Sequence, residues 1–291
     1  MSNDRMRIKG FTMTLWLIVV MASFSVAFAQ APTTPKFEVA SVKSASPDSK
    51  FMMLQPTPGG RLNITNLTLK NMIGSAWGVQ PFQIFSGPAW IDSVRYDVSA
   101  KAEGAAKMPE LMQMLRSLLA DRFQLVIHRE TKELPIFALV LARKDGKLGP
   151  QLVESTEGSC TSPDPTKPPA PPDPAKGPTL ACGQLFVGIQ QLRGLAISIR
   201  RLPPTLSRFL GRNVIDQTGL NGTYDVTLQW TPDDAQLAGY LPPGAPKPPL
   251  SDTAGPSIFA ALQEQLGLKL EATKGPVEVL VIDQVERPDE N

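Results

Sequence analysis

The same succession of apolar and polar positions occurs twice along this chain and a third time in shortened form. The copies run Asn66–Leu69, Trp77-Gly78 and Arg95–Val98; Leu195–Ile199, Leu210-Gly211 and Thr223–Val226; and Ser257–Phe259, Leu266-Gly267 and Leu268–Leu270. In each copy a serine or threonine precedes an apolar run and a glycine follows it. This pattern is typical of a short helix with a side-chain N-cap and a glycine C-cap. The repeat therefore predicts a unit of one helix followed by one strand.

Other segments complete the predicted fold. Strands are expected at Phe37–Lys43, from Arg61 to Ile64 after a Gly59-Gly60 turn, at Phe123–Arg129 and Leu134–Ala142 around a Glu130–Glu133 turn, and at Thr223–Trp230 and Val277–Val285. Pro109 opens a helix with Leu111, Met112, Leu115, Leu118 and Leu119 on one face. Short helices against alternating strands indicate an α+β protein with two related halves of mainly antiparallel sheet.

Two prolines fall inside the helix predicted for the second copy. Pro203 and Pro204 lack the amide donor that a helix interior uses. We therefore expect this helix to begin near Pro203 instead of Ser198, or to be kinked.

The first 29 residues have the pattern of a signal peptide. Basic residues in Met1–Gly10 precede an apolar run to Phe28, and Ala27-Phe28-Ala29 matches a small-x-small cleavage site. We expect a mature chain that starts at Gln30 and has no stable membrane insertion; the alternative is an uncleaved anchor. Of 29 basic and 27 acidic residues, three and one lie in the leader, so the mature net charge is zero. Without a basic stripe, nucleic-acid binding has no support.

Proline is concentrated in two places, Pro163–Pro178 and Pro242–Pro249. The predicted organisation is a signal peptide (1–29), a tail (30–36), a first half (37–158), a linker (159–183) and a second half (184–291) with a proline-rich loop near 231–256. Cys160 and Cys182 flank the linker, and in an oxidising compartment such a pair is expected to be bridged. The disulfide would then close a proline-rich linker between the halves.

Few residues remain for catalysis. His128 is the single histidine, so a multi-histidine metal site is impossible, and its alternating surroundings favour a strand position over a catalytic one. Asp97 and Asp225 follow a tyrosine at equivalent places in the two copies, which favours a turn or strand-edge role over acid–base or calcium chemistry. Asp92 and Asp216 precede turn residues and are expected to accept backbone hydrogen bonds. No catalytic, metal or cofactor-binding residue is predicted, and no cofactor.

Aromatic residues gather in the first half. Trp77, Phe82, Phe85 and Trp90 lie close together in the sequence, where they could form the core of that half or line a groove for a ligand. A core role is favoured, but Trp77, Phe82 and Trp90 are the candidate ligand-binding residues should any of them be exposed.

Several longer motifs are those of a known family. They are Phe37–Lys43, Gly87–Ser93, Tyr96–Val98, Leu118–Phe123, His128–Thr131, Val214–Leu220 and Gly275–Asp283. On these motifs the chain resembles the DUF3738 family, also called TIGR03435, of exported soil-bacterial proteins abundant in acidobacteria. The family has no assigned activity, but some relatives are fused to membrane metallopeptidases of the antibiotic-sensor type. The resemblance therefore implies an extracytoplasmic sensing or binding module; this chain lacks the H-E-x-x-H peptidase motif.

We expect an exported, non-enzymatic envelope protein, periplasmic or extracellular, that binds a small ligand, a peptide or an envelope protein. Two alternatives stay open: a secreted hydrolase that uses His128 or a carboxylate pair, and a purely structural envelope component. The oligomeric state does not follow from the sequence.

Overall fold

The computed structural model describes residues 34–46, 49, 51–156, 158, 160, 180–234, 236–237 and 255–289. The strands are β1 (Val39–Ser44), β2 (Met53–Thr57), β3 (Arg61–Thr68), β4 (Ile84–Phe85), β5 (Arg95–Lys101), β6 (Val126–Leu141), β7 (Leu152–Glu154), β8 (Leu185–Val187), β9 (Gln191–Ser198), β10 (Val214–Asp216), β11 (Thr223–Gln229) and β12 (Leu268–Gln284). The helical segments are α1 (Leu69–Trp77), η1 (Pro81–Gln83), α2 (Trp90–Ser93), α3 (Met108–Phe123), η2 (Ile199–Arg201), α4 (Leu202–Leu210), α6 (Ile258–Ala261) and η3 (Leu262–Leu266). The predicted signal peptide lies outside the described residues.

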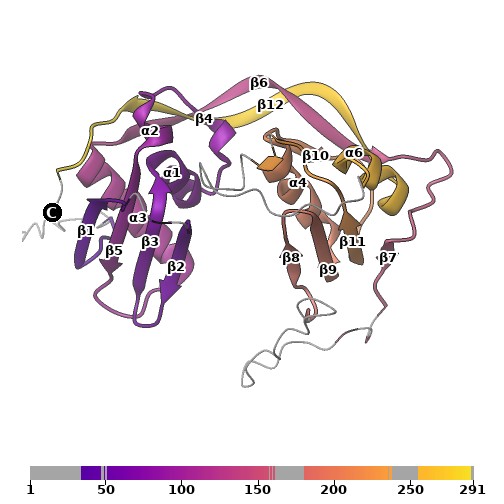
Figure 1. Cartoon of the computed structure of the whole chain (residues 1–291), viewed down its shortest axis with the longest axis horizontal. Helices are drawn as coiled ribbons and strands as arrows, with labels where there is room; N and C mark the ends of the chain where they lie inside the picture. Colours follow the sequence, from indigo (N-terminus) through magenta and orange to yellow (C-terminus); the bar gives the residue numbers. More distant parts are fainter. Residues whose placement is uncertain are drawn as a thin grey trace, which may run out of the picture. The chain divides into compact units, whose positions relative to one another are not determined.

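A first antiparallel sheet has the strand order β1-β5-β3-β2. Helices α1 and α3 pack against it (Figure 1), and their apolar faces form one core with the sheet. Thr68 caps α1 as predicted, because its hydroxyl accepts a hydrogen bond from the Asn71 N–H at 3.2 Å, and Gly78 closes the helix with a left-handed φ of 69°. Helix α3 begins where Glu110 accepts the Lys107 N–H at 2.8 Å. Local capping therefore sets both helices on this sheet.

A second antiparallel sheet has the order β7-β11-β9-β8, and α4, α6 and η3 contribute to its core. Helix α4 begins at Leu202 after the 3-10 turn η2, which confirms that Pro203 and Pro204 shift the helix start. The prolines occupy the first turn of α4, where no intrahelical N–H bond is lost. Gly211 and Gly267 close α4 and η3 in the left-handed conformation, and Ser257 caps α6, as the repeat predicts.

The two sheets share one pairing pattern, which establishes the repeat in three dimensions. In the first, Val98 pairs with Val42 of β1 and Ile64 of β3; in the second, Val226 pairs with Leu152 of β7 and Gly194 of β9. Strands β1 to β6 thus correspond in order to β7 to β12. The α+β class with mainly antiparallel sheets is confirmed.

A central sheet of order β10-β6-β12-β4 joins the repeats. Strands β6 and β12 run antiparallel along their whole length, side by side in Figure 1, while β4 and β10 add in parallel at the outside. Each long strand ends in the core of the other repeat: Leu139 of β6 packs with the second sheet, and Leu280 and Ile282 of β12 pack with the first. The repeats therefore exchange their last strands.

Two predicted boundaries are corrected by this sheet. Residues 130–133 form no turn, because β6 continues through them: Thr131 pairs with Glu278 and Lys132 with Val277 of β12. The predicted strand at 277–285 likewise begins earlier, at Leu268, and includes the alternating segment after Gly267. In these charged segments the backbone N–H and C=O groups form hydrogen bonds with the long neighbouring strand. The strands therefore continue through residues whose charge suggests a turn.

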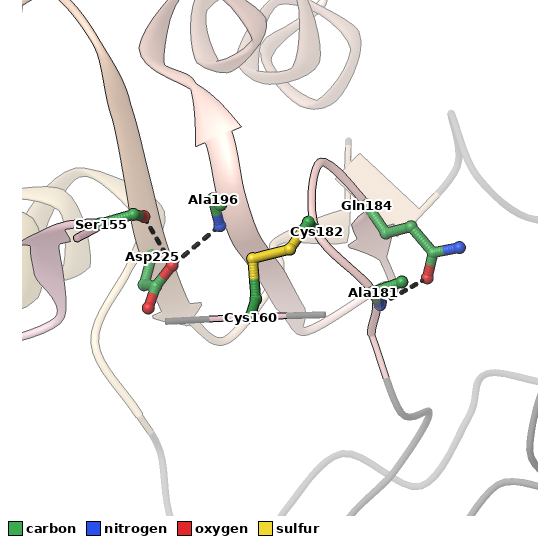
Figure 2. The surroundings of a disulfide bond; sticks show 7 residues. All are labelled: Ser155, Cys160, Ala181, Cys182, Gln184, Ala196 and Asp225. Carbon is green, nitrogen blue, oxygen red and sulfur yellow. Dashed lines mark hydrogen bonds between the residues drawn. A yellow bond between two sulfur atoms is a disulfide. The ribbon is translucent and has the colours of Figure 1, made fainter. Parts of the chain in front are cut away.

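Most of the predicted linker 159–183 lies outside the described residues, but the strands on its two sides belong to the same, second sheet. Strand β7, which precedes it, pairs with β11 of the second sheet, and β8 follows it. Cys160 and Cys182 form the predicted disulfide, with 5.5 Å between their Cα atoms (Figure 2). The bridge therefore joins the segment that leaves one edge strand of the sheet to the segment that enters the opposite edge strand.

Candidate functional site

A cavity of about 210 Å³ opens on the central sheet. All four strands, or the segments that lead into them, supply its lining, which is Phe82, Phe85, Leu134, Pro135, Gly211, Arg212, Asn213 and Val277. Apart from Arg212 and Asn213 the walls are apolar or backbone. The site is therefore an apolar hollow with polar groups at one side.

This cavity lies at the junction of the two repeats. Glu133 and Pro276 pair at the middle of the β6–β12 ribbon, next to the lining residues Leu134 and Val277. Each repeat also contributes the segment just before its short outer strand, β4 or β10. From the first repeat this segment supplies an aromatic ring, Phe82, and from the second it supplies a cation. The two repeats thus supply equivalent backbone segments to the cavity, but the side chains on its two sides differ.

Arg212 carries the charge of the site. It is half-buried, and its guanidinium carbon lies 4.8 Å from the centre of the Phe137 ring. Among the described residues no carboxylate lies within ion-pair distance of it. The Phe137 N–H donates to the Asn213 carbonyl at 2.8 Å, which ties this segment to β6. A planar guanidinium held in this way can bind an anion through two parallel hydrogen bonds.

The aromatic side is also held by local contacts. Pro81 opens the turn η1, and the Gln83 side chain accepts from the Gln80 N–H at 2.9 Å and donates to the Glu278 carbonyl of β12 at 2.9 Å. These bonds fix Phe82 beside the central sheet. Phe85 has Lys132 Nζ 5.3 Å from its ring centre, but this ammonium pairs with Glu130 at 3.1 Å. Among the described residues that line the cavity, Arg212 is therefore the cation available to a ligand.

The other aromatic candidates lie elsewhere. Trp77 and Trp90 are half-buried against the first core, and each carries an arginine over its ring: Arg116 at 5.3 Å and Arg287 at 5.7 Å. Of the three sequence candidates, Phe82 lines this cavity, whereas Trp77 and Trp90 do not. Ligand binding by Trp77 or Trp90 stays a prediction.

The acidic candidates do not meet in one place. Asp97 accepts the Asn66 N–H in the first sheet, and Asp225 accepts the Ala196 N–H and the Ser155 hydroxyl in the second (Figure 2). Both therefore hold strand backbone, as the repeat predicts. Asp216 accepts the Thr218 N–H at 2.9 Å, also as predicted, whereas Asp92 forms an ion pair with Lys70 at 3.1 Å.

His128 lies on β6 of the central sheet. Its side chain is half-exposed, and Nδ1 lies 2.9 Å from both carboxylate oxygens of Asp283 on β12. Neither residue lines a described cavity. The histidine and the two repeated aspartates thus occupy three different sheets.

The pKa shifts fall outside the cavity as well. Burial of the Tyr224 hydroxyl, with a smaller effect of the Glu154 charge, raises the pKa of Tyr224 above 10.0. Hydrogen bonds from Arg143 and the Lys147 backbone lower the pKa of Asp145 on an exposed loop. Among the described residues no group of acids, cysteines and histidine is arranged to hold a metal ion, and no helix there is both long and apolar enough to cross a membrane.

The sequence motifs do not single out Arg212 as a site residue. One signal could have found it: when the two copies are aligned at their helix-closing glycines and following strands, the segment around Phe82 corresponds to the segment around Arg212. A conspicuous aromatic residue, Phe82, in one copy then has a cationic residue, Arg212, as its counterpart in the other.

Most of this chain matches a known protein family. Residues 70–285, more than half of the chain, match the model of a family described as "Protein of unknown function (DUF3738)". Neither a curated protein nor a solved structure matches the chain. The matched residues run from α1 to the end of β12 and so include the whole lining of the cavity. The chain therefore belongs to the DUF3738 family.

Proposed function

We propose that this protein is an exported binding module whose cavity on the central sheet holds a small molecule with an apolar body and an anionic group. The observation that carries the proposal is Arg212, a half-buried cation without an acidic partner among the described residues, in a hollow that is otherwise mainly apolar. Export is supported by the signal-like leader and by the disulfide, because disulfides persist in oxidising compartments.

The two sides of the cavity would orient the ligand. An apolar ring placed against Phe82, Phe85 and Val277 loses contact with water, and its acid group reaches Arg212. The volume is below the usual range of about 300–1,000 Å³ for drug-sized ligands, which favours a compact acid with a single ring. The cavity also touches both repeats and both exchanged strands, so a bound ligand would stabilise the junction between them. A binding event there suits a sensing role.

Simple aromatic acids test the proposal. Benzoate and phenylacetate are titrated into the mature chain, with benzyl alcohol as the neutral analogue, and binding is followed by calorimetry and by the melting temperature. A ligand that binds only the folded state raises that temperature with its concentration. We expect the acids to bind and the alcohol to bind more weakly or not at all.

Two variants assign the effect. Arg212→Gln should weaken binding of the acids about tenfold to a hundredfold, as expected for loss of a charged hydrogen-bonding partner. Arg200→Gln is the matched control, because Arg200 is exposed on η2 and lies outside the cavity. Equal affinity of the acids and the alcohol, or an unchanged affinity in Arg212→Gln, would refute the proposal.

A further inference from the structure

A second cavity, of about 340 Å³, lies at one end of the second sheet, where β9 begins and β11 ends. Its lining is Gln190, Gln191, Gln229, Trp230, Thr231, Gly255, Pro256 and Gln265. None of these described lining residues has a charged side chain. The cavity is larger than the first and has a different chemistry, that of neutral amides beside an indole.

Trp230 lines this cavity and carries a hydrogen-bond donor that has no partner among the described residues. The residue is 4% exposed, and its ring packs edge-on against Phe209 with 5.0 Å between the ring centres. Its indole Nε1 is buried and has no hydrogen-bond partner in the described part of the chain. A buried N–H without an acceptor costs free energy, and most native proteins provide an acceptor from protein, water or ligand. The lining of an open cavity is the place where a ligand could provide one.

The Gln265 side chain is held by hydrogen bonds to the protein backbone, whereas the other glutamine side chains of the lining could bond a ligand. Gln265 of η3 donates to the Gln229 carbonyl at 2.7 Å and accepts the Gln229 N–H at 2.9 Å, as a neighbouring strand would. The side-chain amides of Gln190, Gln191 and Gln229 make no hydrogen bond to another described residue. Each of these amides offers both a donor and an acceptor.

The first repeat has the same backbone here but different side chains. The Trp230 N–H donates to the Gln190 carbonyl at 3.0 Å, just as the Ala102 N–H donates to the Gly60 carbonyl at 2.9 Å. The adjacent cross-strand pair is Gln191 with Gln229 in the second sheet and Arg61 with Lys101 in the first. Neutral amides therefore replace two cations, and a tryptophan replaces an alanine. These differences do not follow from duplication of the frame, and they point to a ligand peculiar to the second repeat.

We propose that this cavity binds a neutral polyhydroxylated ligand of the size of a mono- or disaccharide. A ligand hydroxyl would accept the Trp230 indole N–H, and other hydroxyls would exchange donor and acceptor bonds with the glutamine amides and the Thr231 hydroxyl. A charged ligand would lose its hydration here without gaining an opposite charge. The site is separate from the cavity that holds Arg212, and neither proposal depends on the other.

The Trp230 indole resonance provides a direct test. The mature chain is labelled with 15N at its indoles, and the Trp230 signal is assigned from its absence in Trp230→Phe. Glucose, maltose and cellobiose are then titrated, with glucuronate as a charged analogue and ethanol as a co-solvent control. We expect at least one neutral saccharide to give a saturable downfield shift of the Trp230 indole proton, and glucuronate to bind more weakly.

Two further variants separate binding from general solvent effects. Gln191→Leu removes one amide from the lining and should weaken saccharide binding about tenfold, as for loss of one hydrogen-bonding group. Gln263→Leu changes an exposed glutamine of η3 outside the cavity and should bind normally. Arg212→Gln should also bind saccharide normally. The proposal is overturned if no saccharide gives a saturable shift, if glucuronate binds as well as glucose, or if Gln191→Leu binds like the unchanged chain.

Discussion

The Asp225 carboxylate accepts the backbone N–H of Ala196 at 2.8 Å. Ala196 lies in a bulge of β9 and has a left-handed φ of 47°. In the first repeat Asn66 lies in the corresponding bulge of β3 with a φ of 56°, and its N–H donates to Asp97, also at 2.8 Å. In both repeats, then, an aspartate on the neighbouring strand holds a strained bulge directly before the helical segment.

Removal of either carboxylate should destabilise its own sheet. Asp97→Ala and Asp225→Ala each leave a bulge N–H without its acceptor, so we expect the free energy of unfolding to fall by about 1–3 kcal/mol. Asp289→Ala, at an exposed position near the end of the chain, serves as the control. Urea denaturation followed by circular dichroism measures the change. If Asp97→Ala or Asp225→Ala lost no more unfolding free energy than Asp289→Ala, water would have to replace the carboxylate without cost, and the prediction would be wrong.

Glycine should stabilise the bulge at Ala196 more than the bulge at Asn66. A left-handed φ costs an alanine about 1–2 kcal/mol, whereas glycine adopts it freely and loses about 0.5–1 kcal/mol of unfolded-state entropy instead. Ala196→Gly should therefore raise the free energy of unfolding by a few tenths of a kcal/mol or more. Asn66→Gly should gain less, because asparagine tolerates this conformation and the Asn66 side chain also donates to the Ser49 carbonyl. Parallel denaturation of the two variants tests the order.

The raised pKa of Tyr224 leads us to expect a loss of stability at alkaline pH. Burial raises its pKa above the ordinary value of 10.0, so the folded state holds the phenol proton more tightly than the unfolded state does. Below pH 10.0 both states keep the proton and the contribution to stability is complete. As the pH rises above 10.0 and through the folded pKa, the unfolded chain ionises first and the free energy of unfolding falls. In Tyr224→Phe this part of the alkaline decline should disappear, which denaturation at a series of pH values would measure; an identical decline would contradict the assignment.

The disulfide should stabilise the chain without shaping its sheets. Cys160 and Cys182 are 22 residues apart, and in the chain-entropy model closing a loop of this size contributes about 3 kcal/mol. The double variant Cys160→Ser, Cys182→Ser should lose about 2–4 kcal/mol of unfolding free energy. Its circular dichroism at ordinary temperature should stay unchanged, because the bridge closes an insertion between β7 and β8. A changed spectrum would mean that the bridge is needed for the second sheet itself.

The sequence predicted the features that depend on neighbours along the chain. Glycine C-caps, the Thr68 cap and the apolar face of α3 are local, and so is the effect of Pro203 on the start of α4. The continuous strand β6 was missed because its charged residues at 130–133 resemble a turn, and only the distant β12 makes them a strand.

The candidate site shows the same division. Phe82 could be suggested from an aromatic-rich segment, since that signal is local. Arg212 could not, because its position in the cavity depends on parallel pairing of β10 with a strand of the other repeat. Likewise, the unused indole N–H of Trp230 follows from burial, which the amino-acid pattern does not report.

The exchange of last strands has a consequence for cleavage of the polypeptide. A cut between Ala142 and Gln151, after β6 and before β7, would yield two fragments that each lack a strand their own core requires. Leu280 and Ile282 fill the first core from the second fragment, and Leu139 fills the second core from the first. The fragments should therefore stay together as a noncovalent pair and refold by mutual complementation, while either one alone should aggregate. Cleavage of this single peptide segment would therefore leave the two fragments associated in the native fold.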